Sequence, residues 1–128
     1  MGFTLDATAR TPAIILDDKA ASLTMSGESY PEDVPLFYEA LTEQVTSYFG
    51  AHDDAFTVNI KLTYFNSSSA RALMELLDLL DAEAAKGRAI TVNWYCDPDD
   101  DITREFAEDI SADVAQVQLT IMDLEAEG

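Results

Sequence analysis

The most regular alternation of apolar and polar residues in this 128-residue chain lies between positions 56 and 64. Every second residue there is large and apolar: Phe56, Val58, Ile60, Leu62 and Tyr64. Because successive side chains of a strand point to opposite faces, this spacing predicts a β-strand with one buried face. Similar apolar or alternating segments predict four further strands, at residues 12–16, 21–26, 90–95 and 117–121.

Three other segments carry apolar residues every three or four positions, which is typical of helices with one buried face. The first follows Asp33 and ends at Gly50, the second extends from about Ala70 to Lys86, and the third begins within the acidic run 97–101. The expected inner faces are formed by Val34, Phe37, Leu41, Val45 and Tyr48, then by Ala70, Leu73, Met74, Leu77 and Leu80, and last by Ile102, Phe106 and Ile110.

The predicted order of elements is β-β-α-β-α-β-α-β, an α/β arrangement around a mixed five-stranded sheet. Strands that are separated by one helix run parallel, so we expect parallel neighbours among the last three strands. These strands carry Thr, Asn, Lys or Gln at alternate positions, so the helices should lie mainly on one face and leave the other open. We expect a single domain at residues 11–124, with an N-terminal tail at 1–10 and a C-terminal tail at 125–128.

The excess of acidic over basic residues disfavours some classes of binding partner. Asp and Glu number 25 against 7 Lys and Arg, so the formal net charge is −18. Nucleic-acid binding without sequence preference requires clustered cations, and so does docking on an anionic membrane; both are therefore disfavoured. No apolar run approaches the roughly 18 residues of a membrane span, and no signal-peptide pattern begins the chain. We therefore expect a soluble, cytoplasmic protein.

Candidate catalytic chemistry is sparse. The chain has one histidine, His52, in a predicted loop, and one cysteine, Cys96, near a predicted strand end. A disulfide framework and a cysteine-rich zinc site are excluded, and no phosphate-binding glycine motif occurs. We therefore expect neither an enzyme nor a bound cofactor, and we assign no catalytic residue.

The acidic residues Asp97, Asp99, Asp100 and Asp101 have two interpretations. Carboxylates suit a hard cation such as Mg²⁺ or Ca²⁺, but the run lacks the glycine and distal glutamate of a calcium loop. The simpler interpretation is a helix start, with Asp101 as N-cap and its neighbours near the positive end of the helix dipole. We expect capping and no metal; a small enzyme or metal-binding protein that uses this cluster is the competing hypothesis.

The segment from Tyr64 to Ser69 joins the clearest strand to the clearest helix. In open α/β sheets, ligands are usually presented at this edge. The free N–H groups of a first helical turn favour a phosphate, so a phosphoserine is well placed there. The alternative is that the serines only cap the helix, since Ser is among the preferred N-caps.

The order of elements, with a serine-rich segment before a helix, resembles the SpoIIAA-like, anti-sigma-factor-antagonist (STAS) architecture. Over residues 11–124 the chain more closely resembles the SiaC-type regulatory phosphoproteins of bacteria. The resemblance is carried by Thr11-Pro12, Gly27-Glu28-Ser29-Tyr30-Pro31-Glu32, Tyr64-Phe65-Asn66-Ser67-Ser68-Ser69, Gly87-Arg88, Val92-Asn93-Trp94-Tyr95 and the acidic stretch from Asp97 to Asp101.

This resemblance implies a partner-switching protein. A protein kinase would phosphorylate one hydroxyl and a PP2C-like phosphatase would remove the phosphate. The unmodified form would bind and activate a diguanylate cyclase, which raises cyclic di-GMP and favours aggregation or biofilm. The alternative output is transcriptional, through antagonism of an anti-sigma factor.

The resemblance also assigns residues. The family's modified residue is usually a Thr directly after the Asn, and its position falls on Ser67, with Ser68 and Ser69 as alternatives. The family often has an aromatic residue where this chain has Cys96. We expect the surface around Ser67 to bind partners through Tyr30, Tyr64, Phe65, Asn66 and Arg71.

Overall fold

The computed structural model describes residues 3–31 and 33–123 of the chain. Glu32, the side chain of Val34 and the expected tail at 125–128 lie outside the described residues. Within the described part, the parallel strands alternate with helices, as the pattern of apolar positions predicted.

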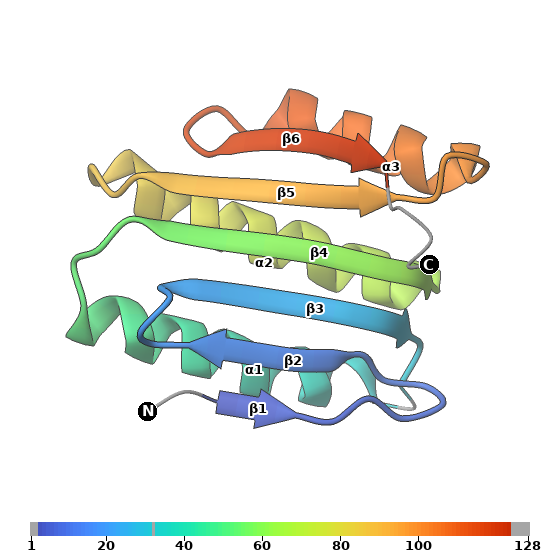
Figure 1. Cartoon of the computed structure of the whole chain (residues 1–128), viewed down its shortest axis with the longest axis horizontal. Coiled ribbons are helices and arrows are strands. Elements are labelled where there is room, and N and C mark those ends of the chain that lie inside the picture. The colour runs from blue at the N-terminus through green and yellow to red at the C-terminus, as the bar shows by residue number, and fades with distance from the viewer. Residues whose placement is uncertain (1–2, 32, 124–128) are drawn as a thin grey trace.

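The sheet has six strands in the spatial order β1-β2-β3-β4-β5-β6, which is also their order along the chain (Figure 1). The β1–β2 and β2–β3 pairs are antiparallel, and the three later pairs are parallel. The strands are β1 (Phe3–Leu5), β2 (Ala13–Asp17), β3 (Ser22–Ser29), β4 (Phe56–Phe65), β5 (Ile90–Cys96) and β6 (Gln118–Asp123).

The expected count of five strands is wrong, because β1 lies within the segment 1–10 that was assigned to a tail. Its three residues pair with Ile14, Ile15 and Leu16 of β2. A three-residue strand contains too few positions to display a two-residue period, which explains why the sequence pattern missed it.

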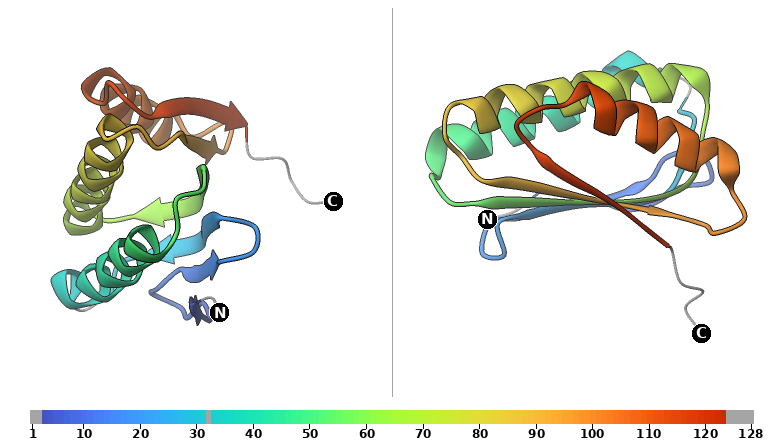
Figure 2. Two further views of the ribbon diagram at one scale, coloured as in Figure 1. Left: turned by 90° about the vertical axis from the view of Figure 1, so that its left-hand side faces the viewer. Right: turned by 90° about the horizontal axis from the view of Figure 1, so that it is seen from above.

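The three helices are α1 (Val34–Ala51), α2 (Ser67–Ala85) and α3 (Asp101–Asp113). Figure 2 shows all three on one face of the twisted sheet, with the other face uncovered. The inward side chains of the central strands are buried between the two layers, among them Met25, Val58, Ile60, Val92 and Trp94. The alternation of polar residues along these strands therefore predicted the layering correctly.

Two expected inner-face residues lie outside the core. Met74 of α2 is 43% exposed and Ile102 of α3 is 82% exposed. An isolated apolar residue beside a buried stripe does not by itself indicate which side of the helix faces the sheet. The buried stripe of α2 passes through Leu73, Leu76, Leu77, Leu80 and Ala84, and that of α3 through Thr103, Ala107 and Ile110.

The helix starts differ from prediction in two places. Asn66 caps α2 by accepting a hydrogen bond from the Ser69 N–H at 2.8 Å, so the helix begins at Ser67 and no serine is the cap. Asp100, and not Asp101, caps α3. Its carboxylate accepts from the Thr103 N–H at 3.0 Å and from the Thr103 hydroxyl at 2.7 Å.

Candidate functional site

The predicted site lies at the edge of the sheet where β3 and β4 end and where α1 and α2 begin (Figure 1). Asn66 connects β4 to α2 and is hydrogen bonded to both sides of this junction. Its backbone N–H donates to the Ser29 carbonyl at 3.2 Å, and its own carbonyl accepts from the Ala70 N–H at 2.9 Å. The start of α2 is therefore held against the end of β3.

A β-bulge near the end of β4 decides which aromatic residue faces outward. Gly27 pairs with Leu62, whereas the next residue, Glu28, pairs with Tyr64, so β4 contains one extra residue at this point. An extra residue reverses the alternation beyond it. Consequently Tyr64 is 51% exposed, although the two-residue period had grouped it with the buried positions.

The two aromatic residues before Asn66 have different surroundings. Tyr64 packs edge-on against Tyr30, with ring centroids 5.5 Å apart, and forms an aromatic surface beside the start of α2. Phe65 packs against Phe106 and Trp94 at centroid distances of 5.1 Å and 6.5 Å. Phe65 therefore joins the edge of the core, while Tyr30 and Tyr64 lie at the surface expected to meet partners.

The three consecutive serines occupy the first turn of α2 but have unlike environments. Ser67 and Ser68 are exposed, whereas Ser69 has no exposed surface. Successive residues of a helix are turned by about 100°, so three neighbours necessarily face three directions. Only the hydroxyls of Ser67 and Ser68 are accessible to another protein in this conformation.

Ser69 is held by a buried hydroxyl network that the sequence pattern did not predict. Ser29 Oγ donates to Ser69 Oγ at 2.9 Å and shares a hydrogen bond of 2.8 Å with the Tyr38 hydroxyl. Burial raises the pKa of Tyr38, while its hydrogen bonds with Ser29 and Ser69 act in the opposite direction. The network joins β3, α1 and α2 directly beneath the exposed serines.

The sequence pattern contained indications that Ser29 and Tyr38 face inward. Ser29 continues the inward positions of β3 after Leu23 and Met25, and Tyr38 lies three residues before Leu41 on the buried side of α1. Neither signal specifies a hydrogen bond, because the partners are brought together only by the packing of the helices on the sheet.

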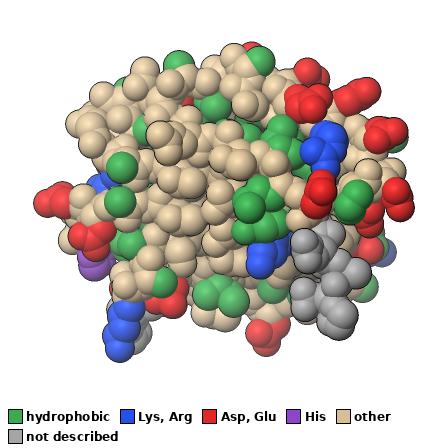
Figure 3. Space-filling view, turned by 45° about the horizontal axis from the view of Figure 1, so that its top comes forward, with side chains coloured by type: hydrophobic (Ala, Val, Ile, Leu, Met, Phe, Trp, Pro, Cys, Tyr) green, Lys and Arg blue, Asp and Glu red, His purple; other side chains and the backbone are tan. Residues whose placement is uncertain are grey.

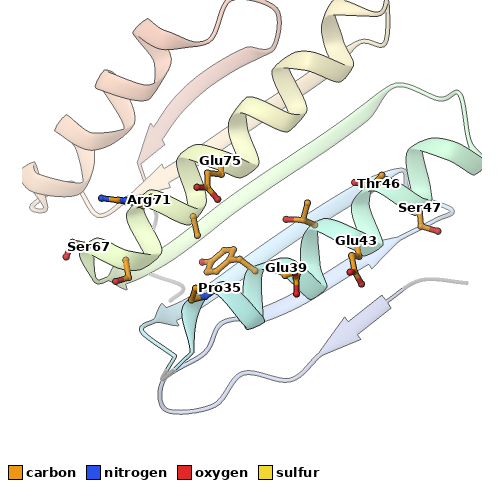
Figure 4. Close-up of a pocket in the computed structure, with 12 residues that line it drawn as sticks. Pro35, Glu39, Glu43, Thr46, Ser47, Ser67, Arg71 and Glu75 are labelled. Carbon is orange, nitrogen blue, oxygen red and sulfur yellow. The ribbon is translucent and has the colours of Figure 1, made fainter.

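A groove of about 1060 Å³ follows the outer side of the molecule between α1 and α2, and the exposed serines line one end of it (Figure 4). Glu39, Glu43 and Glu75 line the groove, and Arg71 contributes its one cationic side chain among the described residues. The remaining lining residues are Pro35, Tyr38, Thr42, Thr46, Ser47, Ser67, Ser68 and Ala72. The predicted partner residue Arg71 thus shares this groove with both exposed serines.

The acidic run after β5 forms a turn and a helix cap. Asp97 accepts a hydrogen bond from the Asp99 N–H at 2.9 Å, and Asp100 caps α3. Figure 3 shows acidic side chains gathered at the end of the molecule where β5 and β6 end. Across residues 3–31 and 33–123, no group of three or more His, Cys, Asp or Glu side chains has an arrangement that could hold a metal ion.

The single histidine and the single cysteine are both packed against other residues of the fold. His52 follows α1 and stacks on Tyr48 with ring centroids 4.4 Å apart. Cys96 is fully buried at the end of β5, and burial raises the pKa of its thiol, which keeps it protonated at neutral pH. Within the described part of the chain, no helix is long and apolar enough to cross a membrane.

Comparison with known proteins identifies relatives over nearly the whole chain. The family model described as SiaC family regulatory phosphoprotein matches residues 5–124. An uncharacterized protein from Pseudomonas aeruginosa (strain UCBPP-PA14) is 32% identical over 106 residues, which cover 83% of this chain and 84% of the relative.

Solved structures give the same result. The crystal structure of apo-SiaC from Pseudomonas aeruginosa matches with a TM-score of 0.87 and 29% identity, over 95% of this chain and 98% of that one. The structure of the diguanylate cyclase SiaD in complex with its activator SiaC, from the same organism, matches with a TM-score of 0.89 and 29% identity. That match covers 95% of this chain and 99% of the other.

Proposed function

Because the chain belongs to the SiaC family of regulatory phosphoproteins, we propose that it is a phosphorylation-controlled adaptor that binds and activates a diguanylate cyclase when unmodified. Activation raises cyclic di-GMP and favours aggregation or biofilm formation. The complex of the related SiaC with the cyclase SiaD supports this output over an anti-sigma-factor antagonist with the same switch.

Ser67 is the proposed site of modification. A protein kinase transfers the γ-phosphoryl group of ATP to Ser67 Oγ, the hydroxyl proton is lost, and ADP leaves. A PP2C-like phosphatase reverses the modification by hydrolysis. The observation that carries this assignment is the exposure of Ser67 and Ser68 at the end of the α1–α2 groove, beside the fully buried Ser69.

The phosphate acts at the surface and leaves the fold unchanged. A phosphoserine carries a charge of about −1.5 to −2, which the first turn of a helix stabilises by roughly 0.3–2 kcal/mol. That energy is too small to rearrange a domain. At a partner interface, however, burying the dianion near other acidic groups costs several times more. The surface that loses the partner comprises the exposed Tyr64 and Arg71 with the partly buried Tyr30, Phe65 and Asn66.

Three further inferences accompany this function. The protein works by binding and not by catalysis, which the structural settings of His52 and Cys96 support. Its regulatory domain includes β1, which pairs with β2, and has a STAS-like architecture, which the layer of helices on one sheet face supports. It acts in the cytoplasm, where its proposed cyclase partner would find GTP.

Phosphate mapping tests the site. The protein is incubated with its cognate kinase and ATP, and the modified residue is identified by mass spectrometry. We expect phosphate on Ser67, and Ser67→Ala should abolish the modification. Phosphate outside residues 67–69, or its complete absence, would contradict the proposed switch; phosphate on Ser68 would move the site by one residue.

Cyclase activation tests the output. Genetically encoded phosphoserine at position 67 is compared with the unmodified protein in binding to the diguanylate cyclase of the same genome and in cyclic di-GMP production. We expect the buried phosphate to cost at least about 1.4 kcal/mol of binding free energy, which lowers the affinity for the cyclase at least about tenfold. Phosphoserine at Ser47, exposed at the other end of the groove, is the matched control. Equal cyclase activation by the unmodified protein and by the protein with phosphoserine at position 67 would overturn the proposal.

A further inference from the structure

Arg71 differs from the other described cations near a helix. It is exposed and has neither a hydrogen bond nor an ion pair with any described residue. By contrast, Lys86 and Arg88 pair with Glu83, and Arg104 pairs with Asp123. An unpaired guanidinium is unexpected in a chain with 25 acidic residues and only 7 Lys and Arg.

The geometry of α2 gives Arg71 a neighbour that can become its counter-ion. Ser67 lies four residues before Arg71, so the two side chains are adjacent on the helix surface. Figure 4 shows Ser67 and Arg71 on the same side of the first turns of α2, with Glu75 on the side toward the groove. Glu75 also lies four residues from Arg71, yet the two form neither a hydrogen bond nor an ion pair within the described structure.

We propose that Arg71 is the internal counter-ion of a phosphate on Ser67, so that modification withdraws the cation of the groove from the partner. This inference rests on the proposed phosphorylation of Ser67. A guanidinium presents paired N–H donors that match two oxygens of a phosphate, which makes Arg71 a stronger partner than a lysine would be. Local charge at the start of α2 changes from about +1 to about −1 on modification.

This change explains how one small group alters a whole surface. Before modification, the groove presents one cation among Glu39, Glu43 and Glu75, and a partner can place an acceptor against Arg71. After modification, Arg71 is occupied by the phosphate and the other charged groups that line the groove are acidic. The partner thus loses an attractive contact and meets additional negative charge in the same step.

The test measures the phosphate directly and needs neither a kinase nor a cyclase. Phosphoserine is encoded at position 67, and its second ionisation is followed by phosphorus NMR as a function of pH at low ionic strength. The same titration is run with Arg71→Gln, with Arg71→Lys, and with phosphoserine at Ser47 on α1. A neighbouring cation favours the dianion, so the midpoint should lie about 0.3 pH units lower in the protein that keeps Arg71 than in the Arg71→Gln variant.

The outcomes separate this inference from the proposed function. Three results together support the counter-ion. Arg71→Gln changes the midpoint of phosphoserine at position 67 but not at position 47, and Arg71→Lys partly restores it. The change caused by Arg71→Gln is also smaller at high salt. An identical midpoint with and without Arg71 overturns the inference, as does an equal response at position 47. Because the phosphoserine is encoded genetically, these results hold whichever serine a kinase modifies.

Discussion

At the scale of single residues, three identical neighbours acquire different roles through the direction in which each one faces. Ser67 and Ser68 are exposed, whereas Ser69 is buried and bonded to Ser29. Exposure makes a serine available for modification, while a buried hydroxyl with a partner contributes to stability. The hydroxyl of Tyr38 completes this buried network from α1.

Replacing Tyr38 with Phe removes one hydroxyl from the network and keeps the ring. We expect the free energy of unfolding to fall by about 1 kcal/mol, because Ser29 loses a buried hydrogen-bond partner. Urea denaturation measures the change. Tyr64→Phe is the matched control. Tyr64 is 51% exposed, so removing its hydroxyl should change the free energy of unfolding by less than about 0.5 kcal/mol. Equal effects of the two substitutions would show that the network adds no stability.

At the scale of elements, the starts of the helices are held by side chains that accept hydrogen bonds from the first turn. Asp33 caps α1, Asn66 caps α2 and Asp100 caps α3. Each cap comes from a short polar residue directly before the helix, which is the preferred chemistry at this position. The cap of α2 also bears on the serines, because Asn66 accepts from the Ser69 backbone N–H at the start of the helix, whose turn sets the direction of each serine side chain.

The cap of α3 should give stability a characteristic dependence on pH. Hydrogen bonds from the Thr103 side chain and backbone lower the pKa of Asp100 below its ordinary value. The folded state therefore holds the proton less tightly than the unfolded state, so this stabilisation is present above about pH 4 and is lost as pH falls further.

Asp100→Ala should accordingly lower the unfolding free energy by about 1 kcal/mol at pH 7 and by less at pH 3. Asp101→Ala is the control: Asp101 lies in the first turn of the helix, where it interacts with the dipole but is not the cap. Urea denaturation at both pH values measures the four differences. If Asp101→Ala proved the more costly substitution, the cap assignment would be wrong.

At the scale of the whole molecule, two layers are joined at the end opposite the serines by one arginine. The side chain of Arg88 is 7% exposed and pairs with Glu83 at 2.9 Å. It also donates to the carbonyls of Phe49, His52 and Asp54 at 3.0, 2.6 and 2.8 Å. Arg88 thus connects the end of α1, the segment before β4 and the end of α2.

Arg88→Gln should therefore be strongly destabilising. The substitution leaves the largely buried Glu83 without its main counter-ion and three carbonyls without a donor, so we expect a loss of about 3 kcal/mol. Lys86→Gln is the control, because the Lys86 side chain is 75% exposed and also pairs with Glu83. Thermal unfolding compares the two proteins, and a similar melting temperature for both would contradict the proposed joining role.

The net charge predicts how the whole molecule responds to salt. A formal charge of −18 on 128 residues causes repulsion between like charges, and this repulsion destabilises the compact folded state. Sodium chloride shortens the screening length to about 10 Å at 0.1 M and further at higher concentration. We therefore expect the melting temperature to rise when salt is increased from about 20 mM to about 500 mM at pH 7. A melting temperature that falls over this range would mean that attractive ion pairs outweigh the repulsion.

Much of the site could be predicted from residues that are close in the sequence. The Tyr64–Ser69 segment was located between a strand and a helix, and the structure places Asn66 and the exposed serines there. The strand and helix periods placed Tyr64 and Met74 on the buried side, whereas both are exposed, because a bulge in β4 and the orientation of α2 against the sheet decide which way they face. Both depend on neighbours that are distant in the chain.

The sequence by itself determined the order of the elements from β2 onward, the face of each central strand that is buried and the acidic character of the surface. Local spacing and composition are sufficient for these features, since they follow from the periods of strand and helix. Only the tertiary structure decided that Ser69 joins Ser29 and Tyr38 inside the molecule. It also decided that Ser67 remains outside with Arg71, at the groove between α1 and α2. These features require the packing of segments far apart in the chain, which no local pattern encodes.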